Sequence, residues 1–143
     1  MIARRLSLLF GIVFLAIGGL ALLPALAPLA PFDAPVVVTL DPHFRLLFGL
    51  FPVNLAHDAI HLLIGFFGVI AARSFASATG YFRKLFWFYL FVAVLGMIPI
   101  TNTIFGIAPV YGWDVPLHLG TAIVAWFAGY GRLSVDAESL GER

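Results

Sequence analysis

The stretch Phe48-Gly49-Leu50-Phe51-Pro52-Val53 occurs again later in the chain as Phe105-Gly106-Ile107-Ala108-Pro109-Val110. Each copy is followed, at the same spacing, by a His-Leu pair, His61-Leu62 and His118-Leu119. Weak internal similarity of this kind indicates that a membrane protein is built from two copies of one structural unit. We therefore expect the two histidines to occupy equivalent places in the two units.

The composition places the chain among integral membrane proteins. Hydrophobic residues make up 62% and charged residues only 10% of the sequence, and the mean hydropathy is +1.06. Apolar stretches lie at about residues 6–28, 53–72, 84–100 and 114–131, and each is close to the ~20 residues that cross a bilayer as a helix. The sequence thus predicts an all-α membrane fold, with four transmembrane helices in a single domain over residues 1–143.

The repeat predicts how these helices are arranged. Each unit comprises two apolar stretches, so the fold is expected to be two tandem helical hairpins of the same orientation, related by a pseudo-twofold axis along the membrane normal. The longer connection of the first unit carries Asp41-Pro42, a pair typical of a helix start, and Gly49, a residue typical of a helix end. We therefore expect a short amphipathic helix at about residues 41–49, lying in the outer interface.

Basic residues near the ends of membrane spans are retained on the cytoplasmic side. Nearly all of them lie at the N-terminus, in the connection between the second and third stretches, or at the C-terminus: Arg4, Arg5, Arg73, Arg83, Lys84, Arg132 and Arg143. Only Arg45 lies on the opposite side. Both termini are therefore predicted to be cytoplasmic. An alternative is a cleaved signal peptide ending at Ala25-Leu26-Ala27.

Charge and composition also exclude several functions. The net charge of +1 and the lack of a basic cluster beyond these topology signals argue against nucleic-acid binding. The chain has no cysteine, which excludes disulfides and thiolate chemistry. It shows no Ser-His-Asp arrangement and no phosphate-binding glycine loop, so we do not expect an enzyme.

At helical spacing, the repeat forms a matching stripe on each of two helices. The first stripe consists of His57, His61, Gly65, Gly68 and Ala72, and the second of Asp114, His118, Ala122, Ala125 and Gly129. Small residues at this spacing allow transmembrane helices to approach closely. We therefore expect the second and fourth helices to pack along these stripes, with His57 facing Asp114 and His61 facing His118.

One interpretation of the polar ends of these stripes is structural. An ion pair between His57 and Asp114 and a hydrogen bond between His61 and His118 would lock the two halves in register. Asn54 and Asp114 also stand where helix N-caps are expected, at the start of the second and fourth helices.

The alternative interpretation is a metal site made of His57, His61, His118 and Asp114. Two histidines at i and i+4 can bind one ion, and three imidazoles with one carboxylate suit zinc, copper or iron. Asn54 or Asp58, or a backbone carbonyl, could hold the second ring nitrogen of a ligand. A haem between two histidines, or a pigment on one histidine, is a further alternative. His43 is expected to be solvated.

The pattern Asn54-x-x-His57-Asp58-x-x-His61-x-x-x-Gly65, with Asp114-x-x-x-His118 later, resembles a bacterial family of small four-helix membrane proteins defined as a domain of unknown function. The resemblance extends from about Gly49 to Gly131. It implies the four-helix fold in the bacterial cytoplasmic (inner) membrane, and it implies no catalytic residue or ligand.

Three functions follow in order of expectation. The first is a non-enzymatic accessory subunit that lies in the lipid bilayer and joins a larger membrane complex or a homo-oligomer. The second is a protein that binds a metal or cofactor at the histidine cluster. The third is a transporter, which is disfavoured because four helices packed along narrow stripes leave little room for a substrate path.

Overall fold

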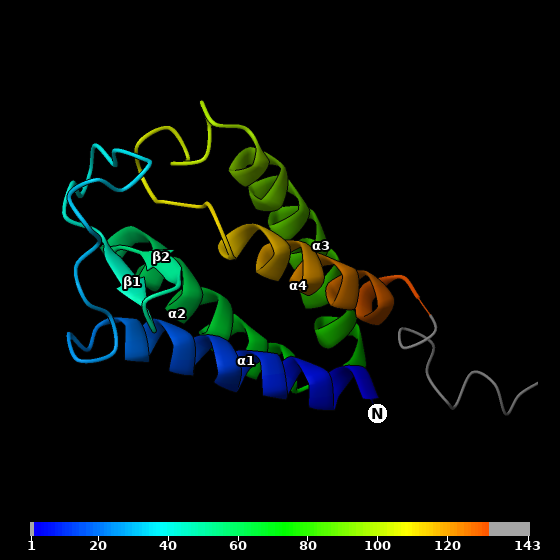
Figure 1. Cartoon of the computed structure of the whole chain (residues 1–143). Helices are drawn as coiled ribbons and strands as arrows, with labels where there is room; N and C mark the ends of the chain where they lie inside the picture. Colours follow the sequence, from blue (N-terminus) through cyan, green and yellow to red (C-terminus); the bar gives the residue numbers. More distant parts are fainter. Residues whose placement is uncertain (1, 132–143) are drawn as a thin grey trace, which may run out of the picture.

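The computed structural model describes residues 2–131 and is mostly helical, as the sequence predicts (Figure 1). Within these residues there are four helices and one antiparallel pair of strands. The elements in chain order are α1 (Ile2–Ala21), β1 (Arg45–Leu47), β2 (Phe51–Val53), α2 (Leu55–Ala71), α3 (Phe75–Met97) and α4 (Asp114–Gly129). Arg132 and Arg143, which contributed to the expected topology, lie outside the described residues.

Two of the helices, α1 and α3, are long and apolar enough to cross a membrane. The helix α2 is also apolar but shorter, with 17 residues. The first residue of α3 is Phe75 rather than a residue near 84, because the Ser74 side chain accepts a hydrogen bond from the Ser77 amide and caps the helix there. The helix α1 ends at Ala21, before the first proline of the loop, Pro24.

The expected interfacial helix at residues 41–49 is wrong, because the segment ends in a β-hairpin. Strand β1 pairs with β2 so that Leu47 is opposite Phe51. The turn between them holds Phe48 and Gly49 at φ values of 55° and 72°. This left-handed conformation cannot continue an α-helix, but it is common in hairpin turns. The second copy of the motif does the same, with Phe105 at 57° and Gly106 at 85°. The repeated Phe-Gly pair therefore specifies a turn.

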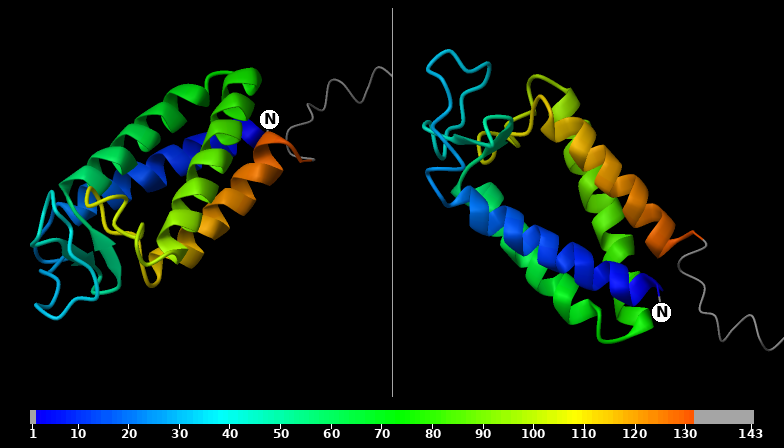
Figure 2. Two further views of the ribbon diagram at one scale, coloured as in Figure 1. Left: turned by 90° about the horizontal axis from the view of Figure 1, so that it is seen from above. Right: turned by 60° about the horizontal axis from the view of Figure 1, so that its bottom comes forward.

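The helices pack in two pairs, with α1 along α2 and α3 along α4 (Figure 2). Although only residues 72–74 connect α2 to α3, the two helices make few contacts, because the pairs diverge from this connection. The fold is therefore two helical hairpins that meet at one end and separate toward the other.

The predicted packing of α2 on α4 along the small-residue stripes is wrong. A Cβ atom added to Gly65 would lie 2.6 Å from the backbone nitrogen of Leu15 in α1, so α2 uses this glycine to approach α1. In the same way, a Cβ added to Gly129 of α4 would lie 2.8 Å from the backbone nitrogen of Arg83 in α3. Small residues permit a close approach by any helix, and here each stripe is covered within its own hairpin.

The other residues of the predicted stripes are placed in the same way. Gly68 also faces α1, where Ser7 donates a hydrogen bond of 2.7 Å to its carbonyl oxygen. Ala122 and Ala125 of α4 belong to an apolar core shared with α1 and α3. Ala72 is the C-cap of α2 rather than a contact between helices.

Two arginines bind the helix ends where the hairpins meet. The Arg4 Nε donates a hydrogen bond of 2.9 Å to the carbonyl oxygen of Ala72, at the end of α2. The Arg83 Nε donates one of 2.8 Å to the carbonyl oxygen of Gly129, at the end of α4. A cation at a helix C-terminus also interacts favourably with the helix dipole.

At the opposite end, the long loop of the first hairpin binds the loop of the second. The Leu40 amide donates a hydrogen bond of 2.9 Å to the carbonyl oxygen of Gly106, and the Asn54 Nδ2 donates one of 2.8 Å to that of Ile107. These bonds hold the separated ends of the hairpins together.

The close approach of α1 and α2 can be tested by replacing Gly65 with alanine. Because the added methyl group would collide with backbone atoms, we expect Gly65→Ala to lower the free energy of unfolding by about 1–3 kcal/mol. The control is Gly120→Ala in α4, where an added Cβ meets nothing within 4 Å and where alanine should be neutral or stabilising by up to about 1 kcal/mol. Thermal unfolding of both variants in the same detergent measures the difference. Equal stability of the two would contradict the packing described.

Candidate functional site

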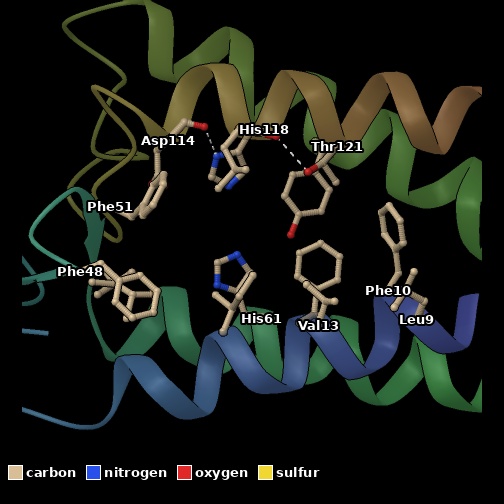
Figure 3. A pocket seen from close by; sticks show the side chains of 15 residues that line it. Leu9, Phe10, Val13, Phe48, Phe51, His61, Asp114, His118 and Thr121 are labelled. Carbon is tan, nitrogen blue, oxygen red and sulfur yellow. Dashed lines mark hydrogen bonds between the residues drawn. The ribbon is translucent and has the colours of Figure 1, made fainter. Parts of the chain in front are cut away.

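Three histidines from two hairpins converge near the end at which the loops meet. His57 and His61 lie one turn apart on α2, and His118 lies on α4. One ring nitrogen from each forms a group whose members all lie within 4.8 Å of one another, and all three side chains are buried. Figure 3 shows His61 and His118 projecting toward each other from opposite sides of a cavity. The structure therefore brings together three of the four predicted ligands.

The fourth predicted ligand, Asp114, lies beside the group. Its Oδ2 atom is 4.0 Å from the Nδ1 of His57, too far for a hydrogen bond. The predicted neighbours are thus adjacent, but they are not bonded. Among residues 2–131, no hydrogen bond joins His61 to His118 either; their rings are nearly parallel, with centroids 6.4 Å apart. The predicted hydrogen bond between His61 and His118 is therefore not formed, and the predicted ion pair is present only as the 4.0 Å contact between His57 and Asp114.

The orientation of His118 leaves one nitrogen free to bind a ligand. Its Nδ1 lies 2.6 Å from the backbone carbonyl oxygen of Asp114. A carbonyl oxygen can only accept, so Nδ1 carries the hydrogen, and in the neutral ring Nε2 is left with a lone pair. Metal-binding histidines are commonly held in this way, with the second nitrogen bound to a carbonyl group.

His57 lies close to the two prolines of the repeat. The backbone carbonyl groups of Pro52 and Pro109 interact electrostatically with its ring, whereas its Nδ1 has no hydrogen-bond partner among the described residues. Because Pro52 and Pro109 are equivalent residues of the repeat, both copies of the motif contribute to the same histidine.

Several buried polar atoms around this cluster have no hydrogen-bond partner among the described residues. They are the Nδ1 atoms of His57 and His61, Oδ2 of Asp114, Oδ1 of Asp58 and the hydroxyl of Tyr89. Buried polar groups are costly unless they are paired, and most in native proteins are. Four of these five atoms belong to side chains of the histidine cluster or in contact with it. Such a concentration is typical of a site in which a ligand completes the bonding.

Asn54 and Asp58 act differently from their predicted role as partners of the histidine rings. The Oδ1 atom of Asn54 accepts a hydrogen bond from the His57 amide, which confirms Asn54 as the N-cap of α2. Its Nδ2 binds the Ile107 carbonyl group instead of a histidine. Asp58 interacts electrostatically with Arg45. Arg45 lies at the loop end of the molecule, whereas Arg4 and Arg83 lie at the other end. Neither Asn54 nor Asp58 therefore bonds to a histidine ring, and the ring of His118 is held by the backbone carbonyl group of Asp114 instead.

The prediction that Asp114 caps α4 is wrong. Asp114 is the first residue of the helix, and Trp113 occupies the cap position without a side-chain hydrogen bond. The carboxylate is therefore not committed to the helix amides and remains free beside the histidines.

Two aromatic residues of the site escaped the sequence analysis. Phe14 of α1 stacks on the His61 ring at 5.6 Å, and Tyr89 of α3 stacks on the His118 ring at 5.0 Å. Phe14 and Tyr89 also stack on each other at 5.5 Å. Both residues lie in helices outside the clear part of the repeat, where many aromatic residues give no pattern that distinguishes these two.

The loops at this end of the molecule contribute buried apolar residues. Val38 and Phe44 from the first loop and Val110 from the second are almost completely buried. The Phe44 ring meets Tyr111 edge to face at 6.1 Å. Burial and the nearby Asp114 carboxylate raise the pKa of Tyr111, so its phenol stays neutral.

The comparison with known families agrees with the resemblance noted in the sequence. The family described as a domain of unknown function (DUF4383) matches residues 4–131, and the chain belongs to this family. No curated protein and no solved structure matches the chain.

The double role of Asn54 can be tested against a residue that acts as a cap alone. Asn54→Ala removes both the cap of α2 and the hydrogen bond to the second loop, whereas Ser74→Ala removes only the cap of α3 and its bonds to Ser77. Loss of a cap costs about 0.5–2 kcal/mol, and loss of the second bond should add about 1 kcal/mol. We expect a larger drop in thermal stability for Asn54→Ala. A drop no larger than that of Ser74→Ala would show that the bond between the loops is unimportant.

Proposed function

We propose that this member of the family is an integral membrane protein that binds a first-row transition-metal ion between its two helical hairpins. The observation that supports this proposal most strongly is the convergence of three buried histidines whose ring nitrogens lie within 4.8 Å of one another. Buried ionisable groups in membrane proteins are costly, and they commonly mark functional sites.

The distances are suitable for one ion after a small adjustment. Bonds of about 2.0–2.1 Å from zinc to imidazole nitrogens place tetrahedral ligands about 3.4 Å apart. The nitrogens of His57, His61 and His118, which lie within 4.8 Å of one another, would have to approach by up to about 1.4 Å, which rotation of the rings can provide. Three neutral imidazoles suit zinc, copper, iron or nickel better than calcium or magnesium, which prefer oxygen.

The carbonyl groups around the rings favour the same conclusion. The Asp114 carbonyl group holds a hydrogen on Nδ1 of His118, so that its Nε2 is available to the ion. The Nδ1 of His57 has no hydrogen-bond partner among the described residues. The Asp114 carboxylate, 4.0 Å from His57, could supply the fourth ligand by a change of side-chain rotamer. If it does not, the fourth position remains open to an exogenous ligand.

A haem between His61 and His118 is less well supported. A porphyrin ring would need a flat space extending sideways from the two histidines, but the stacked rings of Phe14 and Tyr89 occupy the region beside them. His57 also lies close to His61, with ring centroids 4.6 Å apart. A single ion fits this crowded arrangement better.

We further propose that all four helices cross the bacterial cytoplasmic membrane, with a pseudo-twofold axis relating the hairpins and both termini in the cytoplasm. Three pairs of equivalent features support this arrangement: the Phe-Gly turns, the prolines beside His57, and the arginines at the ends of α2 and α4. Those arginines lie at the end of the bundle that the charge distribution assigns to the cytoplasm. The histidines would then lie near the outer face.

The role of an accessory subunit in a larger complex or a homo-oligomer stays a prediction. The described helices expose many large apolar side chains, and lipid can cover these as well as a protein partner can. Binding of a metal is compatible with such a role.

The topology can be tested with single cysteines, since the natural chain has none. Phe32→Cys and Ile100→Cys place a thiol in each of the two loops proposed to lie outside, and Ala76→Cys places one at the opposite end. In intact cells we expect an impermeant maleimide to label the first two variants and to label Ala76→Cys only after permeabilisation. Labelling of Ala76→Cys in intact cells would contradict the orientation, and failure to label Ile100→Cys would contradict four spans.

The metal site can be tested by elemental analysis of protein purified in mild detergent without a chelator. We expect about one equivalent of a transition metal in the natural protein and a loss of more than about tenfold in His61→Ala and in His118→Ala. The matched control is His43→Ala, because His43 is exposed and lies outside the cluster. Natural protein without bound metal that also fails to bind added Co²⁺ would contradict the proposal, as would equal loss in His43→Ala.

A further inference from the structure

A largely apolar cavity of about 400 Å³ lies between the two hairpins, with His61 and His118 in its wall (Figure 3). Small-molecule sites in proteins have similar volumes and linings. Its walls come chiefly from α1, from α4 and from the β1–β2 hairpin, and α1 and α4 make few contacts with each other. Val13 of α1 and Leu117 of α4 line it and are partly exposed at the surface. The cavity is therefore accessible from the side of the helical bundle, where lipid would lie.

Three polar atoms in the wall of the cavity lack partners. The Tyr89 hydroxyl, the His61 Nδ1 and the Asp114 Oδ2 belong to lining residues, and none has a hydrogen-bond partner among the described residues. The side chains themselves are at least nine-tenths buried, with exposures of 2%, 7% and 3%. The Tyr89 hydroxyl can donate a hydrogen bond. A molecule in the cavity with an acceptor at one end could therefore satisfy it.

We propose that this cavity binds a lipid-soluble molecule with a planar conjugated head that carries a carbonyl oxygen, the chemical class of the isoprenoid quinones. The nearly parallel rings of Phe14, His61, Tyr89 and His118 suit a flat head, because aromatic groups prefer stacked or offset packing. The Tyr89 hydroxyl donates a hydrogen bond to the carbonyl oxygen. The apolar tail leaves between α1 and α4 into lipid.

The depth of Tyr89 favours this class over a phospholipid. Tyr89 lies eight residues before the last residue of α3, Met97, which is about 12 Å along the helix axis. A charged phosphate head would have to leave the interface to reach it, at a high cost in solvation. An uncharged conjugated carbonyl group can enter this depth, and its single oxygen matches the donor that the cavity offers.

This inference goes beyond the metal site. The two sites share His61, His118 and Asp114, but His57 belongs to the histidine cluster without lining the cavity, and Tyr89 lines the cavity without belonging to the cluster. The probe is decylubiquinone, added to protein in phosphatidylglycerol nanodiscs, with bound quinone extracted and measured by its absorbance. Empty nanodiscs give the background from partitioning. We expect saturable binding by the natural protein and also by metal-free His57→Ala, so that failure of the metal proposal can be recognised separately.

Two variants test the cavity itself. Tyr89→Phe keeps the stacked ring but removes the donor, and it should weaken binding about tenfold; Tyr81→Phe, on the same helix but outside the cavity, is its control. Val13→Trp fills the opening and should weaken binding at least as much. Its control is Ile12→Trp, which faces outward from the same turn and does not line the cavity.

A competitor separates recognition of the head from recognition of the tail. Decylbenzene has the same tail and a flat ring but no carbonyl group, and it should compete at least tenfold more weakly than the quinone. The proposal is overturned if the natural protein binds no more quinone than empty nanodiscs. It is also overturned if Tyr89→Phe and Val13→Trp both bind like the natural protein, or if decylbenzene competes equally well.

Discussion

The close contact of α1 with α2 at Gly65, and the similar contact of α3 with α4 at Gly129, determines where everything else in the molecule lies. In lipid, apolar surface provides no drive for helices to associate, so backbone proximity and packing decide which helices pair. Once each stripe of small residues is used within its own hairpin, the hairpins share few contacts. Polar residues at the outer ends of the stripes therefore face the space between hairpins instead of a partner helix.

That space is closed on one side by the loops, and the same short motif makes both the turn and the surroundings of the histidine. Phe48-Gly49 and Phe105-Gly106 reverse the chain, and Pro52 and Pro109 follow, with their backbone carbonyl groups close enough to interact with His57. A proline cannot donate a backbone hydrogen bond, but its carbonyl group accepts one as well as any other. The repeat is thus most similar where it builds the site, and weakest in α1 and α3, which enclose it.

The helical class, the approximate positions of the helices and the histidine cluster could be predicted because they depend on local composition and on the repeat. The pairing of the helices could not. A stripe of small residues indicates that another helix can approach closely, but it does not indicate which helix. The sequence alone does not show that Gly65 packs against Leu15 of α1 and not against a residue of α4. The β-hairpin was missed because Asp41-Pro42 and Gly49 are equally suited to a helix and to a turn. Tyr89 was missed because its importance arises only from its neighbours in space.

The bonding of the histidine cluster argues against a purely structural role. The backbone carbonyl group of Asp114 fixes the ring of His118, whereas His57, His61, Asp114 and Tyr89 carry buried polar atoms without partners among the described residues. A structural lock would be stable only if these atoms bonded to one another, since an incompletely satisfied buried network is worse than an apolar core. Here the protein orients the rings but leaves their remaining bonds unmade. That combination is expected where the missing partners come from outside the chain.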